Sequence, residues 1–260
     1  MPLLTSQPLE WSRKVLAFIT DNYADSIVDG PFGASINVNT DYINDGIPVI
    51  RMVNIRPFKF VKANRKFISD TKFKELYRHK IESGDVLFSK VGATTGDCCL
   101  YPESESTAML STTGSCRISV DKTIYQSEFL VIVLNAYRNI FNSITSQVAQ
   151  PFLNMKTIKS VPIPVPSLFE QTEIVRRVEE LFAFADKVEA QVNEAQTRVN
   201  NLTQSILAKA FRGELTADWR AANPDLISGE NSAEALLKRI KAERAKLKPV
   251  KKTTAKKAKA

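Results

Sequence analysis

The stretch EIVRRVEELFAFADKVEAQVNEAQTRVNNLTQSILAKAF, residues 173–211, decides the fold of this 260-residue chain. Its apolar residues follow alternating spacings of four and three without a break. This period is typical of a coiled-coil seam, which is narrower than the apolar stripe of a globular helix. The seam consists of Ile174, Val178, Leu181, Ala185, Val188, Val192, Ala195, Val199, Leu202 and Ile206. We expect a partner helix to cover it, because a single exposed helix of this length is not stable.

Signals at both ends predict that this helix occupies residues 167–213. Ser167 and Glu170 form the pattern of a capping box, in which the hydroxyl accepts from the third helical N–H and the carboxylate reaches back to the Ser167 N–H. Gly213 suits a left-handed C-cap. A helix of about 45 residues is roughly 67 Å long. Packing along this chain's own domain is the poorer alternative, because a domain of about 160 residues is narrower than that.

Residues 1–166 are predicted to form a globular domain of mixed helices and strands. Its last segment, VPIPVP at 161–166, cannot be helical, and its three prolines indicate an extended strand at a sheet edge. One helix is expected over Ser127–Ser143, from the spacing of its apolar residues. Short strands are expected at Ile47–Val53, Phe58–Val61, Val86–Ser89, Cys98–Tyr101 and Cys116–Val120.

The segment after the long helix is expected to hold one short helix and a disordered tail. Residues 214–248 are predicted to hold an irregular stretch around Trp219 and then a short amphipathic helix that begins near Asn231 and Ser232. Residues 249–260 are expected to be a disordered basic tail. The fold class is therefore α+β: a mixed globular domain, a long coiled-coil helix and a short C-terminal helix.

The net charge of +8 is unevenly distributed. Residues 51–90 carry eleven Lys and Arg against four acids, and residues 238–260 carry eleven against one. A basic face on a folded domain favours phosphate contact, because clustered Lys and Arg side chains that bind DNA phosphates release the counterions held there. The basic tail is weaker evidence, since such runs are usually solvated.

Catalytic motifs are missing from the sequence. It has no P-loop, no GxGxxG after a strand, and no Asn/Asp-Pro-Pro-Tyr/Phe tetrapeptide of the kind that amino-methyltransferases use. Asp85 and Lys90 lack the second acid of a nuclease cluster. His79, the single histidine, is expected at the surface or facing phosphate. We therefore predict no catalytic residue in this chain.

The three cysteines, Cys98, Cys99 and Cys116, form neither a disulfide framework nor a zinc site. They are expected to be buried, reduced thiols in a cytoplasmic protein. No apolar run approaches the roughly 18 residues of a membrane span, and the N-terminus does not resemble a signal peptide. We predict no metal site and no membrane contact.

The remaining chemistry favours DNA. Two glycine-flanked loops, Gly30–Ser35 and Lys90–Gly96, permit close backbone approach to phosphates or base edges, although each is also compatible with a plain turn. Arg and Asn are suited to bidentate reading of guanine and adenine. The candidate DNA contacts are Ser35, Arg51, Asn54, Arg56, Lys59, Lys62, Lys90, Thr94, Thr95 and Asn154.

These residues and motifs resemble a known family, the specificity subunits of type I restriction–modification systems. Residues 173–245 are similar to the C-terminal conserved region of type IA members. GIPVIRMVNI (46–55), GDVLFSKVGATTGD (84–97) and QPFLNMKTIKSVPIPVP (150–166) look like recurrent stretches of the family's target recognition domains.

The resemblance implies that residues 1–166 are a target recognition domain that reads one half of a bipartite DNA site. It implies that the helical region binds modification subunits, which carry the adenine methyltransferase and its S-adenosylmethionine. Restriction subunits, which use ATP and Mg²⁺, join indirectly. No cofactor is expected in this chain itself.

Family members usually hold two recognition domains and two conserved helices, whereas this chain holds one of each. We therefore expect half a specificity subunit, completed through the long helix by a second copy or by a complementary chain. Two alternatives remain: a coiled-coil scaffold whose head binds protein, and a stand-alone sequence-specific DNA-binding regulator.

Overall fold

The computed structural model describes residues 11–21, 25–145 and 152–246. The chain divides into two units, Met1–Ala183 and Phe184–Ala260, which are described separately. We refer to the described part of the first unit as the N-terminal domain. The helices are α1 (Asp70–Glu75), α2 (Ser127–Ala136), α3 (Arg138–Thr145), α4 (Met155–Lys159), α5 (Leu168–Phe211), α6 (Ala217–Ala222) and α7 (Ala233–Lys246). The strands are β1 (Ser12–Val15), β2 (Ile27–Asp29), β3 (Ile47–Ile50), β4 (Ile55–Arg56), β5 (Lys59–Phe60), β6 (Lys66–Ile68), β7 (Lys80–Ile81), β8 (Val86–Ser89), β9 (Cys98–Leu100), β10 (Ala108–Leu110), β11 (Ser115–Ile118) and β12 (Pro162–Val165).

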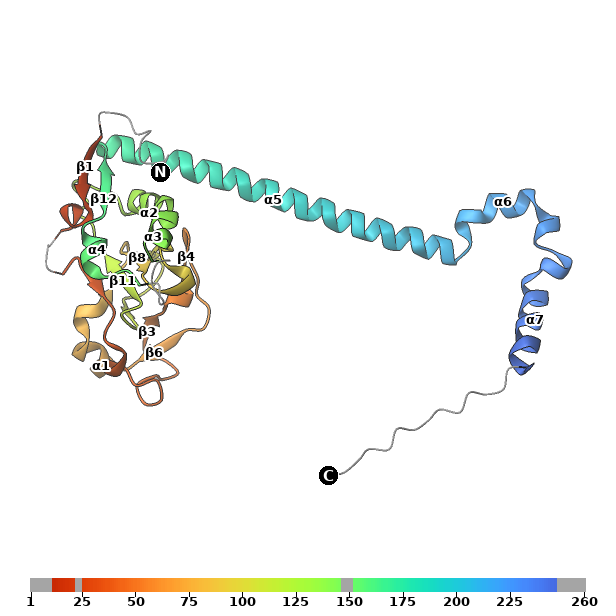
Figure 1. The fold of residues 1–260 in the computed structure, drawn as a ribbon, viewed down its shortest axis with the longest axis horizontal. Helices are drawn as coiled ribbons and strands as arrows, with labels where there is room; N and C mark the ends of the chain where they lie inside the picture. Colours follow the sequence, from red (N-terminus) through yellow and green to blue (C-terminus); the bar gives the residue numbers. More distant parts are fainter. Residues whose placement is uncertain (1–10, 22–24, 146–151, 247–260) are drawn as a thin grey trace, which may run out of the picture. The chain divides into compact units, whose positions relative to one another are not determined.

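Two four-stranded sheets form the body of the N-terminal domain (Figure 1). One has the order β2-β11-β8-β9 and is antiparallel throughout. The other has the order β6-β3-β10-β7, in which only β3 and β10 run parallel. Because successive side chains of a strand point to opposite faces of the sheet, one strand can contribute residues to two hydrophobic cores. Phe88 of β8 packs with the residues of α2 and α3, while its neighbour Leu87 packs with residues of the other sheet.

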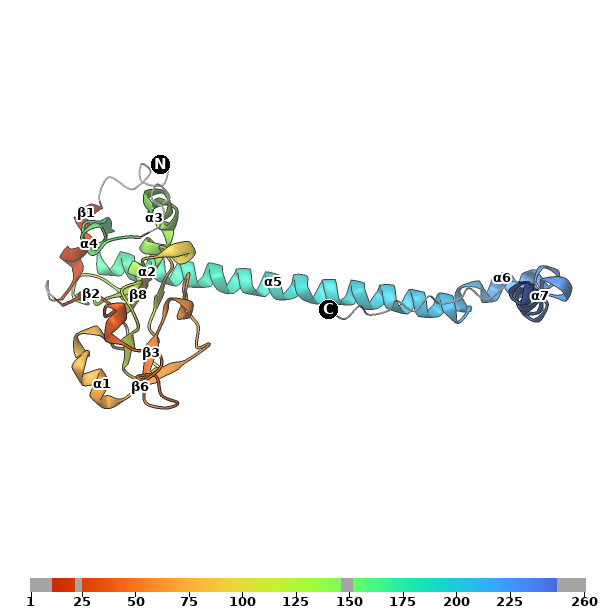
Figure 2. The same cartoon turned by 60° about the horizontal axis from the view of Figure 1, so that its bottom comes forward.

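Helices cover the outer faces of these sheets. Phe129, Leu130 and Leu134 of α2 share one core with β2, β8 and β11, and α2 and α3 lie together on that side (Figure 2). On the second sheet, Val49 and Met109 form a smaller core against which Phe73 of α1 packs. The α+β fold class is thus confirmed, although the helix expected over Ser127–Ser143 breaks between α2 and α3. At the break Tyr137 leaves helical geometry (φ −85°, ψ 0°), and Arg138 donates to the buried carboxylate of Asp97.

The proline-rich exit forms an edge strand, as the sequence predicts. β12 pairs antiparallel with β1 in a two-stranded sheet, with Arg13 opposite Pro164 and Val15 opposite Pro162. Prolines are tolerated there because an edge strand need not donate every ladder hydrogen bond. This pairing joins β1, near the start of the described residues, to β12, which directly precedes α5.

The start of α5 agrees only in part with the predicted capping box. The Ser167 hydroxyl accepts from the Glu170 N–H at 3.3 Å, but the Glu170 carboxylate accepts from the indole N–H of Trp11 at 3.0 Å instead of reaching back. Gln171 is fully buried, accepts from the Gln126 N–H and donates to the carbonyls of Ile124 and Pro166. These contacts fix the first turn of α5 on the N-terminal domain.

The end of α5 follows the prediction closely. Gly213 adopts the left-handed conformation (φ 75°) directly after the helix. α7 begins after Ser232, whose hydroxyl accepts from the Ala235 N–H. The stretch expected to be irregular contains a short helix, α6. The last two residues of the predicted segment 214–248 and the predicted tail 249–260 lie outside the described residues. No helix in the described ranges has the length and apolarity of a membrane span.

Candidate nucleic-acid interface

Five loops converge where strands of both sheets end. They are residues 30–35 after β2, 51–54 after β3, 90–96 after β8, 111–114 between β10 and β11, and 152–154 before α4. We call this group the loop cluster. The parallel pairing of β3 with β10 brings their following loops to the same end, and the antiparallel pairing of β11 with β2 and β8 adds two more.

Backbone hydrogen bonds join these loops directly. Gly30 N–H donates to the Ser115 carbonyl at 3.1 Å, and Lys90 N–H donates to the Gly114 carbonyl at 2.8 Å. Leu153 N–H donates to the Lys90 carbonyl at 2.9 Å. Segments that are far apart in the sequence therefore share one rigid base.

Two glycines permit this close approach. A Cβ at Gly30 would overlap the carbonyl oxygen of Thr112, and a Cβ at Gly114 would lie 2.8 Å from the Met52 sulfur. By contrast, a Cβ at Gly33 would meet nothing within 4 Å. The two glycines of the 30–35 loop therefore differ: the first is required by packing and the second is not.

We expect Gly30→Ala to destabilise the domain by about 1–3 kcal/mol, because the added carbon forces backbone apart at the base of two loops. Gly33→Ala is the matched control and is expected to change the free energy of unfolding by less than about 0.5 kcal/mol. Urea unfolding of both variants measures the difference. Equal stability of the two variants would contradict the packing described here.

The side chains at 51–56 support the backbone more than the sequence suggests. Asn54 is buried: its amide nitrogen donates to the carbonyls of Val61 and Ala63 at 2.8 Å each, and its oxygen accepts from the Arg51 N–H. This network ends β3 at Ile50, before the predicted Val53, and forms a turn over Met52–Asn54. The structure contradicts base reading by Asn54, because every polar atom of its amide is already bonded inside the domain.

The two arginines of this segment are half-buried. A terminal nitrogen of Arg51 donates to the Asn64 carbonyl at 2.6 Å, and one of Arg56 donates to the carbonyls of Met52 and Ile55. Because a guanidinium carries five N–H donors, each retains further donors beyond these bonds. Base or phosphate contact by Arg51 and Arg56 therefore stays a prediction.

We expect Asn54→Ala to destabilise the domain by about 2–3 kcal/mol, since it leaves one N–H and two carbonyls without their partner and water replaces only part of the loss. It should weaken binding to every DNA sequence alike, without changing which bases are preferred. Urea unfolding and binding to matched and mismatched duplexes measure the two effects, with the exposed Asn39→Ala as control. A change of base preference at full stability would restore Asn54 as a reader.

The 90–96 loop also differs from its prediction. Lys90 is fully buried, with its Nζ 3.4 Å from an Asp29 carboxylate oxygen and 5.3 Å from the centre of the Phe152 ring. Thr95 is fully buried and donates to the Gly92 carbonyl, while the half-buried Thr94 hydroxyl bonds that of Ser89 at 2.8 Å. Direct DNA contact by Lys90 and Thr95 is contradicted, because neither side chain reaches solvent.

Four further candidates are at least partly exposed. Lys59 and Lys62 are exposed, and Lys62 forms an ion pair with Glu105. Ser35 is half-buried at the end of the 30–35 loop. Asn154 is exposed, although its side-chain oxygen caps α4 by accepting from the Thr157 N–H at 2.8 Å. Contact of these residues with DNA stays a prediction.

Sequence reasoning missed other members of the loop cluster. The half-buried Thr112 and Thr113, in the loop that joins the two sheets, bring hydroxyls to the cluster. Phe32 and Phe152 add two exposed aromatic rings. The glycine-flanked Thr-Thr pair before Gly114 was the available signal, but its place beside Gly30 depends on strand pairing that the sequence does not reveal.

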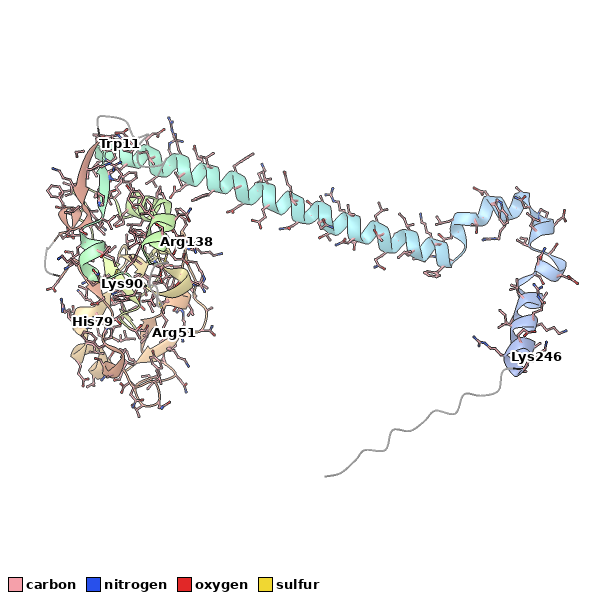
Figure 3. All side chains as sticks on the ribbon, viewed as in Figure 1. Trp11, Arg51, His79, Lys90, Arg138 and Lys246 are labelled. Carbon is pink, nitrogen blue, oxygen red and sulfur yellow. The ribbon has the colours of Figure 1, made fainter. Side chains whose placement is uncertain are left out.

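The titratable groups that were considered from the sequence make contacts within the fold. His79 and Lys90 are labelled in Figure 3. The Nδ1 atom of His79 lies 2.6 Å from the Asp29 carbonyl, so both residues contact Asp29. Asp85 is buried, which raises the pKa of its carboxyl, and it accepts from the Ser119 hydroxyl and the Glu82 N–H. The cysteines are free and buried as predicted, and burial raises the pKa of Cys99 and Cys116 to about 12. Within the described residues, no group of three or more His, Cys, Asp or Glu is placed to hold a metal ion.

The seam of α5 has two parts. Ile174 packs against the core of the N-terminal domain, and Val178 lines an apolar groove together with Phe58 and Phe182, whose rings lie 4.9 Å apart. The expectation that the seam avoids this chain's own domain is therefore wrong for these first positions. From Leu181 onward the seam residues are exposed, with side chains such as Leu181 and Val192 at 60% exposure or more.

Comparison with known proteins gives a consistent result. Residues 33–196 match the family model described as the type I restriction modification DNA specificity domain. The chain is 43% identical over 240 residues to the type I restriction enzyme EcoBI specificity subunit of Escherichia coli, covering 92% of this chain and 49% of that protein. It is 41% identical over 255 residues to the StySPI specificity subunit of Salmonella potsdam, covering 95% of this chain and 54% of that protein. The chain thus spans about half the length of these relatives.

Solved structures show the same fold at lower identity. A chain from a structure of a type I R-M system superposes with a TM-score of 0.63 at 20% identity, covering 80% of this chain and 47% of that one. The HsdS subunit from Thermoanaerobacter tengcongensis gives 0.55 at 20% identity, covering 80% and 46%. With the family model matched over more than half of its length, this chain belongs to the family of type I restriction–modification DNA specificity domains.

Proposed function

We propose that this chain reads DNA sequence for a type I restriction–modification complex and catalyses nothing itself. The observation that carries the proposal is the convergence of five loops from two sheets into one cluster, within a domain whose family is defined by DNA specificity. Functional residues gather on loops held by a rigid scaffold, and base edges are read by loops and helices that enter the grooves. The loop cluster then contacts one half of a bipartite site.

Electrostatics supports DNA over a protein ligand for this domain. The excess of eleven basic residues over four acids in residues 51–90 includes the exposed Lys59, Lys62 and Lys74. Cations of this kind position a protein on the phosphates without reading sequence. A head that binds protein does not by itself require such an excess, and the exposed stripe on α5 favours assembly with other subunits over a stand-alone regulator.

The exposed stripe of α5 supports assembly with other subunits. Its partners, by this proposal, are modification subunits that carry the methyltransferase and S-adenosylmethionine, with restriction subunits that use ATP and Mg²⁺ joining indirectly. A seam of large apolar residues that are exposed from Leu181 to Ile206 is unusual for a helix without a partner. In this proposal the chain determines which DNA sequence is recognised and how the subunits are arranged, while its partners carry out the reactions on DNA.

A second copy of this chain fits the seam in one antiparallel arrangement. It places Leu181 against Ile206, Ala185 against Leu202, Val188 against Val199 and Val192 against Ala195 of the other helix. Each alanine faces a larger residue, so no layer is left hollow. Sliding one helix by a heptad instead brings Ala185 onto Ala195 and places Leu202 and Ile206 opposite Val178 and Ile174, which already pack on the N-terminal domain.

Charge favours the same antiparallel direction. Residues 168–189 carry six acids and three bases, whereas 190–212 carry one acid and three bases. Antiparallel pairing places the acidic half of each helix beside the basic half of the other. Parallel pairing places the two acidic halves side by side and the two basic halves side by side. We therefore favour a second copy over a complementary chain as the partner of α5.

DNA binding tests the role of the domain. In the complex with modification subunits, Lys59→Gln is expected to weaken binding to all duplexes and to lower the slope of log affinity against log salt by about 1, because one phosphate contact is lost. Lys187→Gln, on the exposed part of α5, is the control and should leave the slope unchanged. Equal slopes for the native chain and both variants would move the interpretation toward the protein-binding scaffold.

A further inference from the structure

Phe32 lies in the loop cluster, and the residue is 79% exposed. The other aromatic residues of the N-terminal domain with exposures of 43–53% each contact a second ring or a lysine within the described residues; they are Phe18, Phe58, Tyr77, Phe152 and Phe182. Phe32 has neither kind of contact there. Among the large apolar side chains of the loop cluster, Phe32 is therefore the one that the fold buries least.

The backbone beneath this ring is held firmly. Pro31 fixes its own φ and is buried, and the Phe32 carbonyl accepts from the Ser35 N–H at 2.8 Å. On the other side Gly30 bonds Ser115 and packs against the Thr112 carbonyl. An exposed ring on a constrained loop loses little conformational freedom when it meets a ligand.

The position of the ring suggests what it meets. The neighbouring loops bring hydroxyls and backbone groups suited to phosphates and base edges, and the half-exposed Thr112 and Thr113 belong to the loop against which Gly30 packs. Apolar side chains of proteins that bind the minor groove frequently insert between base pairs, unstack one step and bend the DNA. Such a wedge adds sequence preference, because some steps unstack more easily than others.

We infer that Phe32 inserts between two stacked base pairs of the recognised duplex and stacks on an unstacked base. This inference rests on the proposed function, since it needs the loop cluster to face DNA. It adds a contact that depends on the deformability of a base step and not on its hydrogen-bonding pattern.

The test uses the complex of the full chain with modification subunits and duplexes carrying 2-aminopurine at successive positions of the recognised site other than the methylated adenines, because a methyltransferase flips its target base out of the stack whether or not Phe32 is present. With the native chain, fluorescence should rise at one step, because the probe brightens when it is unstacked. Phe32→Ala should abolish the rise and weaken binding about 5- to 140-fold, the loss expected when stacking on one base is removed. The salt slope should stay unchanged, since no phosphate contact is lost.

Two further variants keep the result interpretable. Phe32→Leu preserves an apolar side chain and the fold, and it should retain part of the affinity with a weaker fluorescence rise. Phe169→Ala, which removes a 91% exposed ring from α5, should change neither the affinity nor the fluorescence. Thermal unfolding checks that all three variants fold as the native chain does.

Each outcome is decisive. Native affinity of Phe32→Ala, or a fluorescence rise that persists in this variant, overturns the wedge while leaving the proposed function intact. A native complex that binds no duplex sequence preferentially overturns the proposed function and the wedge with it.

Discussion

Replacing Val188 and Val192 together with lysine is expected to abolish pairing through α5 and, with it, directed methylation. In the proposed dimer four valines leave the seam and four like charges enter it. The lost burial amounts to about 1.5–3 kcal/mol for each valine, or roughly 6–12 kcal/mol in total, which is comparable to the ~8 kcal/mol of a micromolar association. Light scattering of the purified chain should show the native dimer and a monomeric variant.

The matched control adds the same charge to the opposite face of the same helix. Ala190 and Thr197 lie on the side away from the seam and are exposed, so Ala190→Lys with Thr197→Lys should leave the mass and the methylation unchanged. A Val188→Lys, Val192→Lys chain that remains dimeric would show that the seam is not the pairing surface. A native chain that is monomeric alone but assembles with partners would point to a different chain as the second half.

Inserting one heptad after Val192 is expected to lengthen the unread gap of the recognised site by about three base pairs. The insertion keeps the seam in register and adds about 10 Å of helix at 1.5 Å per residue, and DNA advances about 3.4 Å per base pair along one strand. The two recognition domains of an antiparallel pair move apart by that amount while each half-site stays the same. Sequencing of methylated positions in cells that express the variant measures the gap.

A four-residue insertion after Val192 distinguishes the effect of a longer helix from the effect of a broken seam register. It adds about 6 Å but breaks the alternation of four and three, so we expect a disturbed seam and weaker methylation in place of a cleanly longer gap. If the heptad variant methylates at the native spacing, α5 does not set the distance between half-sites. A non-palindromic native site would exclude two identical recognition domains and leave the recognition role of this domain in place.

The parts of the fold that depend on local sequence could be predicted. The period of α5, its cap at Ser167, its end at Gly213 and the proline-rich edge strand all follow from residues within a few positions of one another. Backbone sterics and short-range hydrogen bonds determine such features, so no tertiary information is needed.

The DNA interface could be predicted only as a set of loops. Residue type made Asn54, Lys90 and Thr95 suitable DNA contacts, but their burial depends on segments that fold against them from a distance. Lys90, for example, meets Asp29, which lies 61 positions earlier. The same limit hid Phe32, because an isolated phenylalanine between Pro31 and Gly33 gives no sign of whether its ring is covered. Exposure is a property of the whole fold, and a sequence pattern reports it only where the pattern is periodic.

The central claim is that this chain determines which DNA sequence its complex modifies. The most direct measurement is single-molecule sequencing of methylated adenines in cells that express the modification subunits with and without this chain. We predict methylation of one gapped sequence that appears only when the chain is present. Methylation that is absent, or unchanged by the chain, in cells where the chain and the modification subunits copurify would contradict the claim.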